Sequence, residues 1–178
     1  MGKEEIVLVD ENDSEIGTEE KIKAHQGGGR LHRAFSIFIF NSRGEMLLQR
    51  RAGGKYHCGG LWTNACCSHP RPGEPTEDAA RRRLMQEMGF DTKLREIFSF
   101  IYRASFENGL TEHELDHVFV GTFNGQPEPN PQEADGFRWV AAEELERDVR
   151  KNPEKYTPWF RISVSKVIEW LKKNKNKI

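Results

Sequence analysis

Strand-like apolar runs dominate the first two-thirds of the chain, with side chains suited to the two faces of a β-sheet. Residues 31–40, LHRAFSIFIF, begin with alternating apolar and polar positions and then become continuously apolar. The turn sequence NSRG at 41–44 separates this run from 45–49, which predicts a β-hairpin. Further strands are expected at 5–9, 94–102, 114–123 and 136–140.

Three helices are predicted among these strands. The first spans 77–88, with Thr76 as its cap and Gly89 at its end. The others span 142–150 and 157–173. Strands joined by hairpins, rather than by regular strand–helix–strand units, indicate an α+β fold with a mixed β-sheet.

The length and the net charge of the protein limit the classes of function that it can have. The 178 residues suit a single domain over residues 1–178, and 27 Lys and Arg against 28 Asp and Glu give a net charge of −1. This balance disfavours a general nucleic-acid coat, and the sequence offers neither a membrane-spanning run nor the apolar region of a signal peptide. We therefore expect a cytoplasmic protein that binds neither nucleic acid nor membrane. The 3 cysteines, an odd number, indicate free thiols in a reducing compartment.

One cysteine stands two residues before a histidine in the segment 63–70, TNACCSHP, which lies between glycine- and proline-containing stretches. A lone cysteine is most often a small buried apolar side chain. In this setting the sequence favours neither packing nor chemistry. As a chemical group, Cys67, close to His69, is suited to act as an acid, a base, a nucleophile or a ligand.

Carboxylates and histidines alternate in the segment 111–117, TEHELDH. On a strand, Glu112, Glu114 and Asp116 project from one face, where their charges repel one another unless water or a cation neutralises them. An edge strand protected by charge is one interpretation. The apolar run 118–120 follows directly, which favours an interior strand and a bound metal.

Two further histidines, His25 and His32, are separated by a glycine-rich segment. Together with His69, Glu112 and Glu114 they offer three nitrogens and at least two oxygens, provided that the fold brings them together. This set suits a borderline divalent cation such as Mn²⁺, Zn²⁺ or Fe²⁺ better than Ca²⁺.

Positive side chains accompany these candidate ligands, namely Lys21, Arg51, Lys55 and Arg83. On a helix, Arg83 lies one turn before Glu87, so a simple salt bridge is a competing interpretation. If the cations converge on an acidic metal site, they predict a phosphorylated ligand, with Mg²⁺ bridging carboxylate and phosphate.

The chain resembles the type 1 isopentenyl diphosphate isomerases of the Nudix superfamily over most of its length. The most specific shared motifs are Asn-x-x-Cys-x-His at 64–69 and Glu-His-Glu at 112–114. Other matching segments include 30–35, 49–51, 133–137 and 157–160. The resemblance implies a Nudix-type α/β/α sandwich with a mixed β-sheet.

The chain departs from the motif of Nudix hydrolases, whose carboxylates hold cations and activate water. Aligned on Gly89, it carries Arg83 and Gln86 at two of the acidic positions and keeps Glu74 and Glu87. This exchange removes the means to cleave a diphosphate and adds a cation to bind one. It favours an isomerase over a hydrolase.

The resemblance also implies a reaction, in which isopentenyl diphosphate becomes dimethylallyl diphosphate by a 1,3-allylic proton shift. An acid protonates C4, and a base on the other face removes a proton from C2. By resemblance, Cys67 and Glu114 exchange these protons, in an order that stays open, and Trp159 with Tyr102 stabilises the cation at C3. For Trp159, a core aromatic at a helix start is the competing interpretation, and Cys66 is expected to pack.

Two cation sites and an anion site are implied in the same way. One divalent metal (Mn²⁺, Mg²⁺ or Zn²⁺) is expected on the ligand set His25, His32, His69, Glu112 and Glu114. A Mg²⁺ bound with the substrate diphosphate is expected at Glu87. The implied substrate-binding residues are Lys21, Arg51, Lys55, Ser68 and Arg83.

Two other functions stay open. A Nudix pyrophosphohydrolase would release phosphate with Mg²⁺, although the missing acidic positions oppose it. A noncatalytic protein with a structural Zn²⁺ on cysteine and histidine would unfold on chelation, although paired Cys-x-x-Cys elements are lacking. For the isomerase we expect a small-molecule substrate, isopentenyl diphosphate, and a monomer or weak homodimer.

Overall fold

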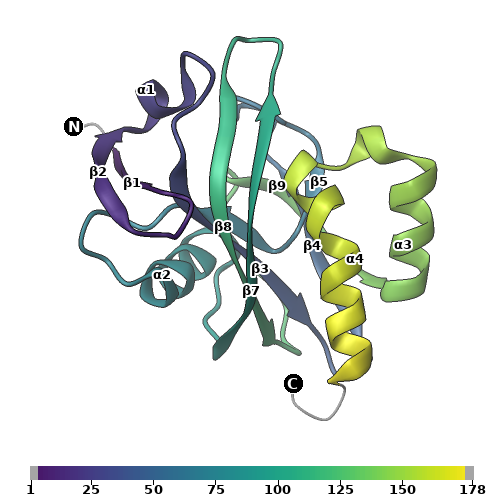
Figure 1. The fold of residues 1–178 in the computed structure, drawn as a ribbon. Coiled ribbons are helices and arrows are strands. Elements are labelled where there is room, and N and C mark those ends of the chain that lie inside the picture. The colour runs from purple at the N-terminus through teal and green to yellow at the C-terminus, as the bar shows by residue number, and fades with distance from the viewer. Residues whose placement is uncertain (1–3, 175–178) are drawn as a thin grey trace.

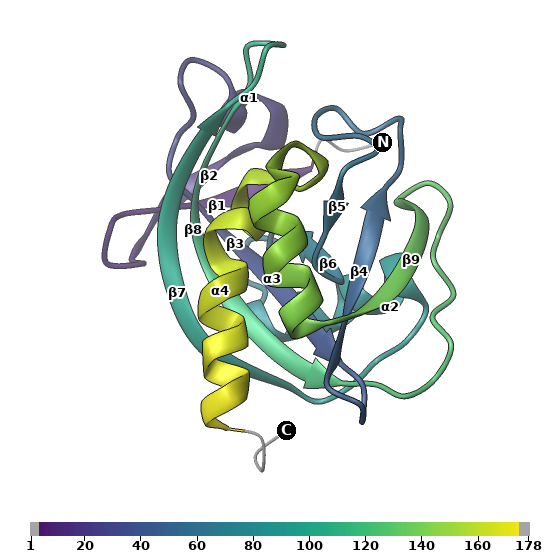
Figure 2. The same cartoon turned by 90° about the vertical axis from the view of Figure 1, so that its right-hand side faces the viewer.

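The computed structural model describes residues 4–174 as a curled mixed β-sheet with helices on both faces (Figure 1 and Figure 2). The strands are β1 (Glu5–Val9), β2 (Glu15–Glu20), β3 (His32–Phe40), β4 (Glu45–Arg51), β5 (Trp62–Thr63), β6 (Cys66–Ser68), β7 (Leu94–Ser105), β8 (Thr111–Thr122) and β9 (Ala134–Ala141). The helices are α1 (Lys21–His25), α2 (Thr76–Met88), α3 (Ala142–Lys151) and α4 (Pro158–Lys173), with a 3₁₀ turn at Pro153–Lys155.

The central strand of the sheet is β3. Along one edge it pairs in parallel with β8, from His32 opposite Glu114 to Phe40 opposite Thr122. Along the other edge three antiparallel strands follow one another, with β1 at its start, β6 in its middle and β4 at its end. The sheet widens through β2 on β1, β7 on β8, and β5 and β9 on β4.

Side-chain alternation along β3 divides its residues between two cores. Phe38 and Phe40 lie in the core beneath α3 and α4, whereas Phe35, Ile37 and Ile39 lie in the core beneath α2. Because both faces are covered, apolar side chains are buried at consecutive positions, which explains the continuous apolar run. The expected α+β sandwich with a mixed sheet is confirmed.

Every strand and helix predicted from the sequence is present, with ends shifted by up to three residues. The prediction missed β2, α1, β5, β6 and the 3₁₀ turn at Pro153–Lys155, all of them short. The sequence of β2, EIGTEE, is polar because the strand lies at the edge of the sheet and is largely half-exposed or exposed. The predicted cap at Thr76 is wrong: Thr76 is the first helical residue, Pro75 precedes it, and no side chain caps the helix.

None of the helices in residues 4–174 has the length and apolar character needed to cross a bilayer.

The end of α2 requires glycine. Gly89 has φ +77°, and a Cβ at this position would lie 2.8 Å from the backbone oxygen of Glu128. We predict that Gly89→Ala lowers the free energy of unfolding by about 3 kcal/mol, because left-handed strain and overpacking add. The matched control is Gly109→Ala, with φ +80° and nothing within 4 Å, which should cost only about 1 kcal/mol. Equal losses in urea unfolding would contradict the argument.

Candidate functional site

Polar side chains collect where β3 and β8 both begin. Because the two strands are parallel and His32 lies opposite Glu114, alternate residues of both strands share one face. On that face stand His32 and Ser36 of β3 with Glu112, Glu114 and Asp116 of β8, all of them buried. Farther along both strands the same face is apolar and lies in the core beneath α3 and α4. The polar site is therefore the buried end of that core.

Five buried residues with metal-ligating side chains meet in this region, and one candidate ligand atom of each lies within 4.8 Å of all the others. They come from the end of α1, the start of β3, the residue after β6 and the start of β8. They are His25, His32, His69, Glu112 and Glu114. The structure thus brings together the five residues that the sequence suggested as a ligand set.

The hydrogen bonds of two of these histidines direct their second ring nitrogen, Nε2, into the cluster, where Nε2 of His25 lies 2.9 Å from Oε2 of Glu112. Nδ1 of His25 lies 2.6 Å from the Lys21 carbonyl oxygen, and Nδ1 of His32 lies 2.8 Å from that of Arg30. A neutral imidazole that donates from Nδ1 presents a lone pair at Nε2. Nε2 of His32 is buried and has no hydrogen-bond partner among residues 4–174, and it lies 3.5 Å from a Glu114 oxygen. A nitrogen lone pair and a carboxylate that face each other repel unless a cation lies between them. A set of nitrogen and oxygen donors suits a divalent metal.

The electrostatics of His69 and Glu112 favour the same conclusion, whereas the hydrogen bond with Glu112 raises the pKa of His25 despite its burial. Burial lowers the pKa of His69 to about 4, so this imidazole is neutral at neutral pH. Burial opposes ionisation of Glu112, yet its hydrogen bonds with His25 and His57 hold its pKa well below the usual range. A neutral imidazole and an ionised carboxylate are the forms that bind metals.

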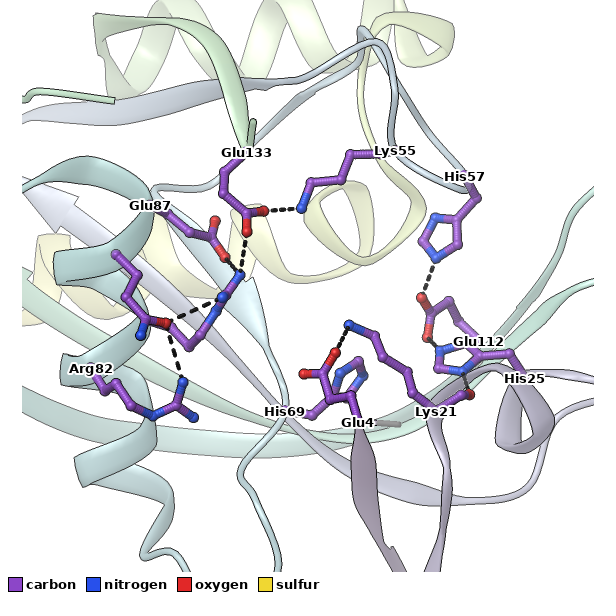
Figure 3. A network of polar contacts seen from close by, with 12 residues as sticks. Glu4, Lys21, His25, Lys55, His57, His69, Arg82, Glu87, Glu112 and Glu133 are labelled. Carbon is purple, nitrogen blue, oxygen red and sulfur yellow. Dashed lines mark hydrogen bonds and ion pairs between the residues drawn. The ribbon is translucent and has the colours of Figure 1, made fainter. Parts of the chain in front are cut away.

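His57 is a member of this site that the sequence analysis missed. Its Nε2 lies 2.5 Å from Oε1 of Glu112 (Figure 3). Its ring stacks on Phe106 at 4.4 Å, with Tyr56 edge-on at 4.4 Å. His57 lies in the loop between β4 and β5, where neither alternation nor helical spacing gives a signal. The one available clue was a histidine two residues after the candidate phosphate ligand Lys55.

A small cavity of about 40 Å³ adjoins the cluster. Its walls include every residue proposed from the sequence as catalytic, Cys67, Glu114, Tyr102 and Trp159. They also include every residue proposed to bind substrate, Lys21, Arg51, Lys55, Ser68 and Arg83. Residues far apart in the sequence thus border one space.

The two adjacent cysteines lie on opposite faces of the sheet. In β6, Cys67 pairs with Ser36 and Cys66 pairs with Ile37. Cys66 is fully buried in the core beneath α2, whereas Cys67 borders the cavity. Burial raises the pKa of the Cys67 thiol to about 12, so its sulfur carries a proton at neutral pH.

Glu114 faces two further groups at the cavity. Tyr102, directly opposite on β7, donates its hydroxyl proton to Oε2 at 2.5 Å. Nε2 of His69 lies 2.9 Å from Oε1. On another wall, the guanidinium of Arg51 stands 5.3 Å from the ring centroid of Trp159, so this indole already contacts a positive charge.

Carboxylates partner the cations of the cavity. Glu133 forms ion pairs with both Lys55 and Arg83, and Glu4 lies 3.1 Å from Lys21 (Figure 3). Neither carboxylate was predicted from the sequence as a site residue. Their side chains hold the ammonium and guanidinium groups beside the cavity.

Glu87 stands apart from the five-residue cluster. Its Oε1 lies 2.6 Å from Arg83, as the helix salt-bridge interpretation expected, and its Oε2 accepts a hydrogen bond from Gln49 at 3.0 Å. Glu87 is buried, and its partner Arg83 borders the cavity.

Comparison with known proteins identifies the family to which the chain belongs. The NUDIX domain family profile matches residues 30–160. The chain is 55% identical over 166 residues to isopentenyl-diphosphate Delta-isomerase 2 of Aromatoleum aromaticum, covering 93% of this chain and 87% of that protein. It is 48% identical over 176 residues to isopentenyl-diphosphate Delta-isomerase 1 of the same organism, covering 99% of both.

Solved structures agree on the fold. The DR0079 protein from Deinococcus radiodurans superimposes with a TM-score of 0.77 at 22% identity, covering 92% of this chain and 98% of that one. The MutT protein from Methanosarcina mazei gives 0.61 at 19% identity, covering 83% and 96%.

We predict that His57→Phe, which keeps the ring stacking but removes the nitrogen beside Glu112, weakens divalent-metal binding about tenfold. Groups that orient a metal ligand typically contribute a factor of about 10 to 100 in affinity. Titration calorimetry with Zn²⁺ measures the effect. The matched control is His113→Phe, because His113 lies between Glu112 and Glu114 in sequence but contacts the Gly29 carbonyl oxygen instead. Unchanged affinity in His57→Phe would refute the role.

Proposed function

The chain belongs to the isopentenyl-diphosphate Delta-isomerase family within the NUDIX domain fold, and we propose that its cavity converts isopentenyl diphosphate to dimethylallyl diphosphate. This isomerisation serves isoprenoid biosynthesis. A proton is added at C4, positive charge develops at C3, and a proton leaves C2.

The observation that carries the proposal is the meeting of Cys67 and Glu114 at one cavity whose walls also hold four cationic side chains. Hydrolysis of a diphosphate would need the acidic positions that Arg83 and Gln86 now occupy. Arg83 pairs with Glu87, the remaining acidic residue of that motif on α2, and partly neutralises it. An isomerase needs only to hold the diphosphate, which the cations suit.

Proton transfer is assigned to Cys67 and Glu114. An isolated alkene is a very weak base, so it needs an acid in a site that excludes water, and Glu114 is buried and Cys67 partly buried. The Tyr102 hydroxyl at 2.5 Å holds Glu114 from the side away from His69. The order in which the two residues give and take protons stays open. Trp159 offers its π face to the positive charge at C3.

The ligand set His25, His32, His69, Glu112 and Glu114 is proposed to hold one divalent cation, Mn²⁺, Mg²⁺ or Zn²⁺. Such a cation, when bound, supplies positive charge that sets the acidity and geometry of a ligating carboxyl group. His57 orients Glu112 for this role from the opposite side.

The diphosphate is proposed to bind Lys21, Arg51, Lys55, Ser68 and Arg83. Binding would replace Glu133 on Lys55 and Arg83, and Glu4 on Lys21, by phosphate oxygens. The Mg²⁺ that accompanies the diphosphate would be held at Glu87, beside Arg83. These contacts bind and orient the substrate without taking part in bond changes.

A single functional domain over residues 1–178, a monomeric or weakly dimeric state and a cytoplasmic location remain predictions.

Incubation with isopentenyl diphosphate and Mg²⁺ in D₂O, followed by NMR, tests the function. We predict dimethylallyl diphosphate with deuterium in its methyl groups, because the added proton comes from groups that exchange with solvent. Release of inorganic phosphate would instead support a hydrolase. Unlabelled, intact substrate with folded, metal-loaded protein would contradict both.

Single substitutions of the adjacent cysteines test the assignment of the thiol. We predict that Cys67→Ala lowers kcat by about a thousandfold, within the usual range for general acid–base groups. Cys66→Ala should keep most of the activity and lose only stability, because Cys66 packs beneath α2. Steady-state kinetics with thermal melting separates the two effects. The reverse pattern would refute the assignment.

A further inference from the structure

Beneath the cavity, one buried chain of hydrogen bonds connects Cys67 with Trp159. Cys67 Sγ donates to Oδ1 of Asn64 at 3.0 Å, and Oγ1 of Thr63 donates to the same oxygen at 2.9 Å. Nε1 of Trp159 donates to Oγ1 of Thr63 at 3.0 Å. Asn64 and Thr63 are at most 1% exposed, and neither borders the cavity.

The amide of Asn64 has only one possible orientation. Its Nδ2 lies 3.1 Å from the carbonyl oxygen of Ile37 and 2.8 Å from that of Cys66. Carbonyl oxygens only accept, so the amino group must face them, and Oδ1 must face Cys67 and Thr63. The thiol proton therefore points at Asn64. A thiolate in the same place would face a carbonyl dipole of the wrong sign.

The hydroxyl of Thr63 is equally constrained. It accepts from the Trp159 indole and lies 2.9 Å from the hydroxyl of Thr157. Since its single proton goes to Asn64, Thr157 must donate to it, which uses both oxygen lone pairs. Every donor and acceptor of the Thr63 and Asn64 side chains is satisfied, so the directions of these hydrogen bonds are fixed.

We propose that Asn64 and Thr63 are positioning residues of the isomerase, which together fix the Cys67 sulfur and the Trp159 indole relative to the same five-carbon substrate. This inference rests on the proposed function. Rotation about the Cβ–Sγ bond of Cys67 moves its proton between Asn64 and the cavity without displacing a heavy atom. Ser36, whose Oγ lies 3.6 Å from Sγ, supports the sulfur from the β3 side.

The contacts imply an effect on turnover rather than on binding. The diphosphate would contact cations on α1, α2 and the β4–β5 region, and neither Thr63 nor Asn64 is hydrogen-bonded to any of them among residues 4–174. A small displacement of a reacting group can cost about a hundredfold in rate. Breaking the hydrogen-bond chain should therefore lower kcat and change KM little, although the Trp159 ring lies 5.3 Å from the Arg51 guanidinium.

Thr63→Val keeps the shape of the side chain and removes its hydroxyl, whereas Thr63→Ser keeps the hydroxyl. We expect Thr63→Val to lower kcat about 30-fold, with KM within about twofold, and Thr63→Ser to recover most of the rate. In ¹H–¹⁵N spectra the indole N–H signal of Trp159, assigned by its loss in Trp159→Phe, should shift and exchange faster in Thr63→Val. The matched control is Ser163→Ala, which removes a buried hydroxyl bonded to the Trp159 carbonyl oxygen 2.8 Å away and should alter stability alone.

Other outcomes are equally informative. A wild-type protein without isomerase activity would refute the proposed function and this inference with it. If the wild type is active, a Thr63→Val protein with wild-type kcat, or with an unchanged indole signal, overturns the inference alone. If Thr63→Val does not fold, the wild-type spectrum decides. A Trp159 indole N–H that is protected from exchange supports the chain of hydrogen bonds, and one that exchanges as fast as free indole overturns the inference.

Discussion

The site depends on the parallel pairing of β3 with β8 in one register. That pairing sets His32 beside Glu114 and turns the polar first halves of both strands toward the same buried space. A shift by one residue would turn Glu112 and Glu114 to the opposite face, where Leu115 packs with Val7 and Val9. The remaining ligands arrive from short elements attached to this pair, His25 from α1 and His69 after β6.

Charge balance then decides what this space can hold. Two buried carboxylates and three imidazoles form a donor set for a cation, while the cationic side chains of the neighbouring wall form ion pairs with Glu4 and Glu133. A bound metal and a diphosphate would complement both halves at once. Arg83 stands where a Nudix hydrolase has an acidic residue, and it adds to the positive charge that Lys21, Arg51 and Lys55 bring to the wall.

Most of the fold could be predicted from the sequence, because the alternation of apolar and polar residues and the chemistry of turns are local properties. It also identified the ligand set by residue type, but not the pairing that assembles it, since β3 and β8 are far apart in the chain. His57 was not predicted as a site residue because it lies in an irregular loop. The different environments of Cys66 and Cys67 follow from the pairing of β6 with β3, a three-residue strand too short to predict from its own sequence.

The most direct test of the metal cluster is X-ray absorption spectroscopy on the Zn²⁺-loaded protein. The account predicts a first shell of nitrogen and oxygen at about 2.0–2.2 Å, with three imidazoles recognisable by their multiple scattering and no sulfur. A sulfur ligand at about 2.3 Å would contradict it, since that distance identifies a cysteine-bound structural zinc.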